Sequence, residues 1–189
     1  MENNEQEKFS LKSELFDFIK TFLICLVSIW VLTTFFFTPV RVDGDSMYPT
    51  LHHEDMGFSN VFSANFFDVN RFDVVVVNAP DENSKDHWVK RVIGLPNETI
   101  ECIDDVIYID GEPIEQDFLD EAYQQSQIDI YGYFTYDFGP YTLGEDEYFV
   151  LGDNRTNSTD SRVVGPFKRD QITSKGVFVY FPFSHFSFN

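Results

Sequence analysis

The chain has 189 residues, of which 32 are acidic and 13 are basic, giving a formal net charge of −19 at pH 7. This length is enough to bury one hydrophobic core. Beyond residue 38 the chain keeps 27 acidic and 10 basic residues, a balance that argues against nucleic acid and anionic lipid as partners of this part as a whole. We interpret the charge as a feature that keeps the segment soluble.

The first predicted element is a membrane-spanning helix. Residues 21–38 contain no ionisable side chain other than Cys25. At 1.5 Å per residue this run extends about 27 Å, close to the ~30 Å hydrocarbon core of a bilayer. A cleaved signal peptide has a shorter apolar core that ends at small residues, whereas this run ends in Phe35-Phe36-Phe37-Thr38-Pro39. We therefore predict an N-terminal tail at 1–14 and a retained anchor at 15–38.

The basic residues that flank the anchor predict its orientation. Lys8, Lys12 and Lys20 lie on its N-terminal side, and on the other side only Arg41 precedes Arg71. The side with more positive charge normally stays in the cytoplasm. The N-terminus is thus predicted to be cytoplasmic, and the rest of the chain to lie on the extracytoplasmic face.

Cysteine usage gives a prediction about the redox state of the outer segment. Cys25 lies in the predicted anchor and Cys102 lies beyond it, so the two thiols cannot readily meet. The outer segment is therefore predicted to fold without an internal disulfide.

The outer segment, residues 39–189, is predicted to be mainly β, with an antiparallel sheet. Asp104-Asp105 and Asp110-Gly111 indicate hairpin turns. Residues 112–146 are predicted to be an excursion from the core, with one short helix near residues 118–123. The predicted strands are short runs rich in β-branched and aromatic residues, at 72–78, 88–94, 99–103, 106–109, 147–151 and 176–181.

Ser46 is the first candidate catalytic residue. It lies in Gly44-Asp45-Ser46-Met47-Tyr48-Pro49-Thr50-Leu51, a Gly/Pro-containing turn that would constrain and expose its hydroxyl close to the end of the anchor. A serine needs a positioned base to become a good nucleophile. The histidines at 52, 53, 87 and 185 are candidates for that base, although each alone is better explained as a surface histidine.

Lys90 is the other candidate base. Alternation along the strand at 88–94 places it on the same face as Trp88 and Val92. Apolar neighbours lower the pKa of an amine from about 10.4, so that its neutral form can accept a proton. The adjacent Arg91 cannot do this, because guanidinium stays protonated. Taken alone, however, Lys90 fits better as an edge-strand lysine that reaches water.

A polar loop at 152–162 is the third notable segment. It reads Gly-Asp-Asn-Arg-Thr-Asn-Ser-Thr-Asp-Ser-Arg, between apolar residues on both sides. Its two aspartates and two arginines indicate internal salt bridges. A calcium site is an alternative interpretation, but the spacing departs from the EF-hand and the arginines would repel a cation.

Together, the segments 46–51, 90–96 and 152–162 resemble the defining boxes of the type I signal peptidases, or bacterial leader peptidases, in their compact Gram-positive form. The resemblance covers most of residues 15–183. It implies a serine endopeptidase, anchored in the plasma membrane, that removes N-terminal signal peptides from exported preproteins. It also implies cleavage after small residues in an Ala-X-Ala-like pattern, with no cofactor and no metal.

The resemblance also implies roles for individual residues. Ser46 would be the nucleophile, with its backbone amide helping to hold the oxyanion, and Lys90 the general base and then the general acid. Some relatives have a hydroxyl where this chain has Gly44, so that side-chain donor is absent or replaced. Ser158 would orient Lys90. Further supporting residues would be Asp153, Asp160 and Arg162, which form ion pairs, and Arg155.

Substrate specificity is expected to come from shallow apolar pockets that exclude large side chains. The substrate is expected to bind in an extended form by adding to a sheet edge. The residues that match the pocket walls are Val40, Val42, Met47, Trp88 and Val89.

Three other functions are alternatives to this one. They are an inactive membrane-anchored relative that serves as a binding module, an organellar inner-membrane peptidase, and a serine esterase that uses a histidine. A self-cleaving repressor shares the serine–lysine pair but needs a DNA-binding segment, where this chain has its predicted anchor. Substitution of Lys90 distinguishes the esterase, which would survive it.

Overall fold

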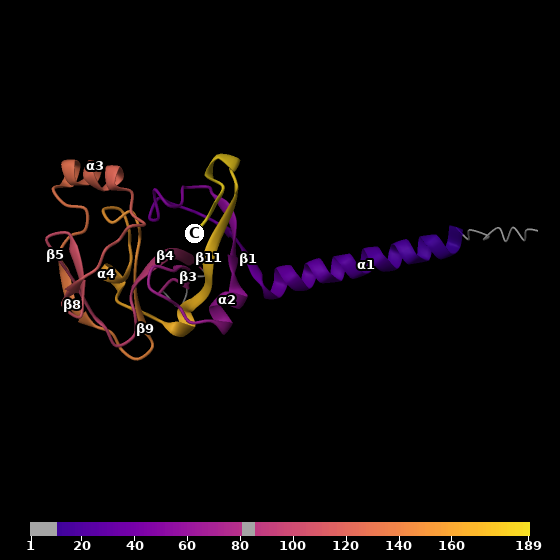
Figure 1. Ribbon diagram of the computed structural model, residues 1–189, viewed down its shortest axis with the longest axis horizontal. Helices are drawn as coiled ribbons and strands as arrows, with labels where there is room; N and C mark the ends of the chain where they lie inside the picture. The colour runs from indigo at the N-terminus through magenta and orange to yellow at the C-terminus, as the bar shows by residue number, and fades with distance from the viewer. Residues whose placement is uncertain (1–10, 81–85) are drawn as a thin grey trace, which may run out of the picture. The chain divides into compact units, whose positions relative to one another are not determined.

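The computed structural model describes residues 11–80 and 86–189. The chain divides into two compact units, one that ends at Phe36 and one that begins at Phe37. Figure 1 shows the path of the chain through the helices and strands of both units, and we describe each unit by itself.

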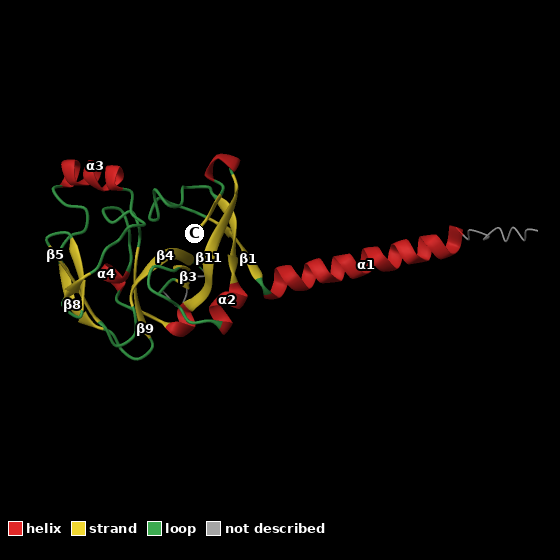
Figure 2. Ribbon diagram, in the orientation of Figure 1, coloured by secondary structure: helices red, strands yellow, loops and turns green. Residues whose placement is uncertain are grey.

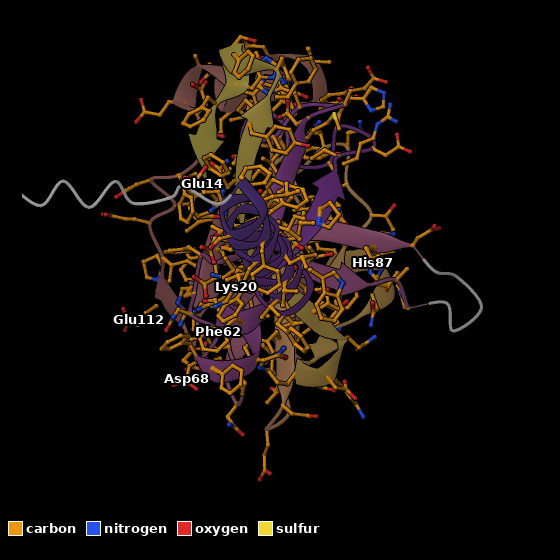
Figure 3. All side chains as sticks on the ribbon, turned by 90° about the vertical axis from the view of Figure 1, so that its right-hand side faces the viewer. Glu14, Lys20, Phe62, Asp68, His87 and Glu112 are labelled. Atoms are coloured by element: carbon orange, nitrogen blue, oxygen red, sulfur yellow. The ribbon has the colours of Figure 1, made fainter. Side chains whose placement is uncertain are left out.

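The described residues of the first unit form the helix α1 (Leu11–Phe35). Beyond Lys20, which is labelled in Figure 3, this helix has no Asp, Glu, Lys or Arg. Its segment Ser13–Thr33 has a mean hydropathy of 2.1 and is long and apolar enough to cross a membrane. The helix ends before residue 38, where we predicted the end of the anchor, because residues 37 and 38 instead begin a strand.

The second unit is mainly β, and all of its strand pairings are antiparallel, which confirms the predicted fold class (Figure 2). The larger sheet has the order β1-β2-β11-β3-β4-β9-β10, and β12 pairs with β11 outside this path. Its strands are β1 (Phe37–Arg41), β2 (Met56–Asn60), β3 (Val74–Asn78), β4 (His87–Gly94), β9 (Glu147–Leu151), β10 (Phe167–Lys168), β11 (Ile172–Phe181) and β12 (Ser187–Phe188).

The smaller sheet has the order β7-β6-β5-β8. Its strands are β5 (Thr99–Ile103), β6 (Val106–Ile109), β7 (Glu112–Pro113) and β8 (Phe138–Thr142). The predicted hairpin between β5 and β6 is present. Its two turn residues, Asp104 and Asp105, have φ angles of 51° and 66°, the left-handed values that a tight two-residue hairpin requires.

Residues 112–146 are more closely tied to the sheets than we predicted. They supply β7 and β8, the two outer strands of the smaller sheet, and the helix α3 (Glu121–Tyr131). The helix begins later than the predicted short helix because the side chain of Asp120 caps it by accepting from the backbone N–H of Tyr123. It ends at Gly132, which has a left-handed conformation.

The described part of the second unit also contains two short α-helices and two 3₁₀ turns. They are α2 (Val61–Phe66), α4 (Ser161–Val164), η1 (Arg169–Gln171) and η2 (Phe183–His185). The turn η2 lies between β11 and β12, close to the C-terminal end of the chain.

The core explains how β4 is placed. This strand lies between β3 and β9, so it is not an edge strand. Its two faces are both covered: Trp88 and Val92 pack into one apolar cluster, and Val89 packs against another. Side chains in the middle of β4 are therefore buried on both faces of the sheet, and this includes the charged residues Lys90 and Arg91.

The two cysteines are both free thiols. Cys25 is exposed on α1, whereas Cys102 is buried in the smaller sheet and its Sγ lies 3.6 Å from the carbonyl oxygen of Thr135. Burial, assisted by Asp137 and Asp105, raises the pKa of the Cys102 thiol to about 11.

Candidate active site

Ser46 lies in the turn that connects β1 to β2. Two backbone hydrogen bonds close this turn, from Val42 N–H to Asp55 O at 2.9 Å and from Glu54 N–H to Val42 O at 2.8 Å. The side chains of Met47 and Leu51 are buried and fix the turn to the core, while Ser46 itself stays half-buried. The hydroxyl is therefore held in place but remains accessible.

Gly44 accounts for the missing side-chain donor in this turn. Its φ angle is +93°, a value that glycine adopts easily and other residues adopt only with strain. A hydroxyl-bearing residue would be unfavourable at this position in the present backbone, although there is open space where its Cβ would stand. The backbone N–H of Gly44 instead donates to His53 Nδ1 at 3.0 Å.

Lys90 contacts Ser46 directly. Its Nζ lies 2.7 Å from Ser46 Oγ, within hydrogen-bond distance. Only 4% of Lys90 is exposed, and the amine lies 5.7 Å from the centre of the Trp88 ring. Burial lowers the pKa of Lys90 to about 8, since desolvation outweighs the opposing effect of Asp160 and Asp153. The amine is therefore partly neutral near physiological pH and can accept the serine proton.

Asp153 forms a buried ion pair with Arg91, the residue that follows Lys90. The Arg91 guanidinium donates to both carboxylate oxygens, with Nε to Oδ1 at 2.9 Å and the second contact at 2.7 Å. Thr50 Oγ1 donates to the same carboxylate at 2.6 Å. This group connects the loop at 152–162 to β4 and to the turn that carries Ser46.

Asp160 and Arg162 form a second ion pair, and both of their side chains are fully buried. Asp160 also accepts a hydrogen bond from the backbone N–H of Gly152 at 3.0 Å. Burial opposes ionisation of Asp160, but the hydrogen bonds and charge of Arg162 outweigh it and lower the carboxyl pKa. Close to Lys90, the Asp160 carboxylate raises the pKa of the amine, and the Arg162 guanidinium opposes this effect.

The loop at 152–162 also contacts the backbone of Ser46. The Asn154 N–H donates to Ser46 O at 3.0 Å, and its side-chain amide donates to Asp45 O at 3.0 Å. Gly152 lies so close that an added Cβ would stand 2.4 Å from Ser46 O and 2.2 Å from Ser158 Oγ. Only glycine permits this approach between the two segments.

Ser158 does not donate to Lys90 in this structure. Its Oγ is buried and has no hydrogen-bond partner of good geometry among the described residues. Ser158 lies close enough to Asp160 to lower the carboxyl pKa, but its effect is smaller than those of Arg162 and Gly152.

Arg155 has a different environment from the other charged residues of the loop. Although only 1% of it is exposed, it has no carboxylate partner within 4 Å in the described part of the chain. It donates instead to Gly152 O at 3.0 Å, to Thr135 Oγ1 at 3.2 Å and to Gln116 Oε1 at 2.5 Å. Arg155 therefore connects the loop to residues 112–146, and its burial lowers the guanidinium pKa to about 10.

Helix α3 contacts both segments of the site. Gln127 accepts a hydrogen bond from Thr156 Oγ1 at 2.8 Å. The ring of Tyr123 packs edge-on against Tyr48, with ring centres 5.0 Å apart. Residues 112–146 thus brace the turn of Ser46 as well as the loop at 152–162.

A small cavity lies beside Ser46 and Lys90. Its volume is about 100 Å³, and four of the five predicted pocket residues line it: Val42, Met47, Trp88 and Val89. The fifth, Val40, lines a larger groove of about 650 Å³ that shares Trp88 and Val89 with the cavity. The cavity has room for a small side chain, and the groove extends along β1.

Sequence reasoning missed three of the residues that hold the site together. Thr50, Arg91 and Asn154 make the contacts described above, and each belongs to a segment that we had singled out. No histidine hydrogen-bonds to Ser46 among the residues that the structure describes. The geometry therefore favours the lysine over the histidines as the base.

A serine hydroxyl in contact with a buried lysine amine defines the class of serine–lysine hydrolases. Comparison with known families agrees, because residues 15–181 match the family described as "Signal peptidase, peptidase S26". The chain therefore belongs to the S26 family of signal peptidases.

Individual relatives support the same assignment. The chain is 38% identical over 181 residues to signal peptidase I S of Bacillus subtilis (strain 168), covering 95% of this chain and 96% of that one. It is 40% identical over 182 residues to signal peptidase I of Bacillus amyloliquefaciens, covering 96% of each. A crystal structure of a signal peptidase I from Enterococcus faecalis V583 matches with a TM-score of 0.50 and 34% identity, covering 57% of this chain and 96% of that one.

These findings confirm the predicted activity. The chain is a serine peptidase that removes signal peptides, by the serine–lysine mechanism that is general to its family. Its substrates are accordingly preproteins.

Proposed function

We propose that Ser46 and Lys90 are the catalytic pair of this signal peptidase. The observation that carries the proposal is the 2.7 Å contact between Lys90 Nζ and Ser46 Oγ, made by an amine that is 4% exposed. A lysine in contact with water would stay protonated near neutral pH, whereas burial makes the neutral amine available as a base.

The reaction then proceeds in two halves. Neutral Lys90 takes the proton of Ser46 Oγ as the oxygen attacks the scissile carbonyl, and the backbone N–H of Ser46 stabilises the oxyanion. The resulting ammonium gives its proton to the leaving amine, which is the new N-terminus of the mature protein. In the second half, Lys90 takes a proton from water, the hydroxide equivalent attacks the acyl-enzyme, and Ser46 regains its proton as the signal peptide leaves with a free carboxylate.

The remaining predicted residues have supporting roles in this proposal. Asp153 and Asp160 fix the loop through their ion pairs with Arg91 and Arg162. Ser158, whose buried Oγ lies close to Asp160 and Gly152, would orient Lys90 during the reaction. The chemistry requires no metal and no cofactor.

The substrate lies extended along the groove next to β1, with a small side chain in the 100 Å³ cavity. The cavity accepts alanine readily, whereas a large side chain would clash with its walls, Val42, Met47, Trp88 and Val89. Val40, on the larger groove, contributes to a neighbouring subsite. This arrangement accounts for the Ala-X-Ala pattern expected of the substrates.

We also propose the domain arrangement and location of the chain. Residues 1–14 form a cytoplasmic tail, residues 15–38 are an anchor that spans the plasma membrane once, and residues 39–189 form a protease domain on the extracytoplasmic face. The apolar segment Ser13–Thr33 and the excess of lysine on its N-terminal side support this arrangement. Membrane-bound preproteins are then near the site as they emerge from the bilayer.

Cleavage of a preprotein with an Ala-X-Ala site tests the catalytic assignment. The full-length chain is compared in detergent with Ser46→Ala and Lys90→Ala, and circular dichroism verifies that all three are folded. We expect cleavage by the wild type alone. Cleavage that survives Lys90→Ala would move the base to another residue, and folded wild-type protein that cleaves nothing would favour the binding-module alternative.

A further inference from the structure

A cluster of two histidines and one aspartate lies apart from the Ser46–Lys90 pair. Asp55 is 1% exposed, and the His185 Nδ1 lies 2.7 Å from one of its carboxylate oxygens. The His52 Nδ1 lies 3.8 Å from the other oxygen. We propose that His52, Asp55 and His185 bind one divalent transition-metal ion of the zinc class.

The separations of the potential ligand atoms fit this ion. One atom from each of the three residues lies within 4.8 Å of the others. Zinc binds imidazole nitrogen and carboxylate oxygen at about 2.0–2.2 Å in a tetrahedral arrangement, which places neighbouring ligand atoms about 3.3–3.5 Å apart. The histidine–aspartate distances of 2.7 Å and 3.8 Å lie on either side of this range. Shifts of the ligand atoms by up to about 1 Å would therefore produce the tetrahedral arrangement.

One ligand atom in the cluster lacks another partner. His52 Nδ1 is buried and has no hydrogen-bond partner among the residues that the structure describes. Leaving a buried polar nitrogen unpaired is costly, and most such atoms in folded proteins find a partner. A metal ion between His52 and Asp55 would satisfy this atom.

Asp55 supplies a fixed ligand, whereas the two imidazoles can adjust. The carboxylate of Asp55 accepts from the backbone N–H of His52 at 2.8 Å, and its backbone oxygen accepts from Val42. The rings of His52 and His185 stack with centres 4.0 Å apart and an interplanar angle of 20°. Metal binding requires the ring planes to open, and side chains that are 36% and 33% exposed have room to do so.

The donor set also indicates the class of ion. Two imidazoles and one carboxylate suit zinc and its neighbours in the transition series, whereas magnesium and calcium prefer oxygen ligands alone. Three protein ligands leave a fourth position for water. The proposal departs from the sequence expectation of no metal, which rested on the family resemblance.

The position of the cluster gives the ion a structural role. His52 is in the turn that carries Ser46, and its ring packs edge-on against Tyr48 at 5.0 Å. His185 lies in η2, near the C-terminal end of the chain. A bound ion would join these two segments, and would thereby stabilise the turn of Ser46 without contacting the reacting atoms.

Titration with zinc tests the proposal. The full-length chain in detergent, without a polyhistidine tag, is titrated with ZnCl₂ by calorimetry in excess Mg²⁺, which occupies non-specific acidic sites. His52→Phe keeps an aromatic ring but removes the nitrogen ligands, and His185→Ala removes the second imidazole. His87→Ala, at an exposed histidine outside the cluster, is the matched control. Co²⁺ reports the coordination geometry through its visible absorption.

We expect one equivalent of zinc to bind to the wild type and to His87→Ala, with a raised melting temperature in both. Each variant at His52 or His185 should weaken binding by at least about tenfold, the loss seen even for outer partners of metal ligands. Equal binding by the wild type and both cluster variants would overturn the proposal, as would the absence of binding to folded wild-type protein. In either case the cluster is a histidine–aspartate ion pair only.

Discussion

Lys90 places an amine in the middle of a sheet, where its charged form is poorly solvated. The pKa of about 8 means that protonation competes with catalysis in the ordinary working range. We predict that kcat/KM rises with pH through about 8 and then levels off, because only the neutral amine accepts the serine proton. At pH 6 the neutral fraction is about 1%, so the rate should be about 100-fold below its plateau.

A pH series with a fluorogenic Ala-X-Ala peptide measures this dependence directly. Circular dichroism at each pH serves as the control for unfolding. A rate that stays constant between pH 6 and 9 would show that Lys90 is not the base in the rate-limiting step.

Gly152 gives a second prediction at the level of single residues. In Gly152→Ala the new Cβ would overlap Ser46 O and Ser158 Oγ, so the loop and the turn of Ser46 must separate. We expect a loss of at least about 100-fold in kcat, since small displacements of a reacting group cost about this much. Peptide cleavage measures it.

Gly144→Ala provides the matched control for that variant. The three atoms nearest to its Cβ would all belong to the side chain of Glu147, the nearest 3.2 Å away, and that side chain can move. Activity in Gly152→Ala that equals the activity of Gly144→Ala would contradict the close approach described for the loop.

Some of the site residues could be predicted from the sequence, and others required the strand pairing. Ser46 and Lys90 lie in recognisable motifs, and Lys90 has the apolar face that alternation predicts. From the sequence, Arg91 is predicted only to be unable to act as a base. Its role depends on the register of β4 with β9, in which Arg91 lies opposite Leu151, two residues before Asp153. Neither the sequence of β4 nor that of the loop at 152–162 alone predicts the ion pair between Arg91 and Asp153.

At the scale of elements, α3 has a larger part in the site than its place in the sequence suggests. Gln127 on this helix accepts from Thr156 in the catalytic loop. We predict that Gln127→Ala lowers kcat by about two- to tenfold, because the lost hydrogen bond is worth about 0.5–1.5 kcal/mol and positions the loop. KM should change little, since Gln127 lies outside the groove and cavity that would bind the substrate.

Gln125→Ala is the control on the same helix. Gln125 is exposed, and within the described part of the chain its side chain donates to Asp129, one turn further along. Steady-state kinetics of both variants separate a positioning effect from general loss of helix. Equal kcat values for the two variants would contradict a positioning role for Gln127.

Two of the strands that sequence reasoning missed, β1 and β8, share a physical cause. β1 continues the apolar run of the anchor and contains Pro39, so its residues resembled the end of a helix. β8 contains Gly139-Pro140, a pair more typical of turns. Both become strands because a partner strand supplies their hydrogen bonds, and no local pattern encodes that partner. The strands with β-branched runs, such as β3 and β4, were predicted because their own residues favour the sheet.

At the scale of the whole molecule, one apolar helix and one acidic catalytic unit share a single chain. The proposed topology predicts that a protease added outside spheroplasts digests residues 39–189 and leaves the N-terminal tail protected. Antibodies against the two ends of the chain would detect the fragments. A cytoplasmic marker protein provides the control for intact membranes, and digestion of the tail alone would reverse the proposed orientation.

The two free cysteines differ in accessibility, so that thiol labelling can measure how the catalytic unit unfolds. Thiol reagents attack the thiolate, so the exposed Cys25 is available to a reagent that reaches α1, whereas Cys102 is shielded by burial and by its pKa of about 11. Modification of Cys102 then requires the smaller sheet to open. When Cys25 is blocked first, the labelling rate of Cys102 measures the rate at which the catalytic unit unfolds. This measurement needs no substitution and can be made in a native membrane.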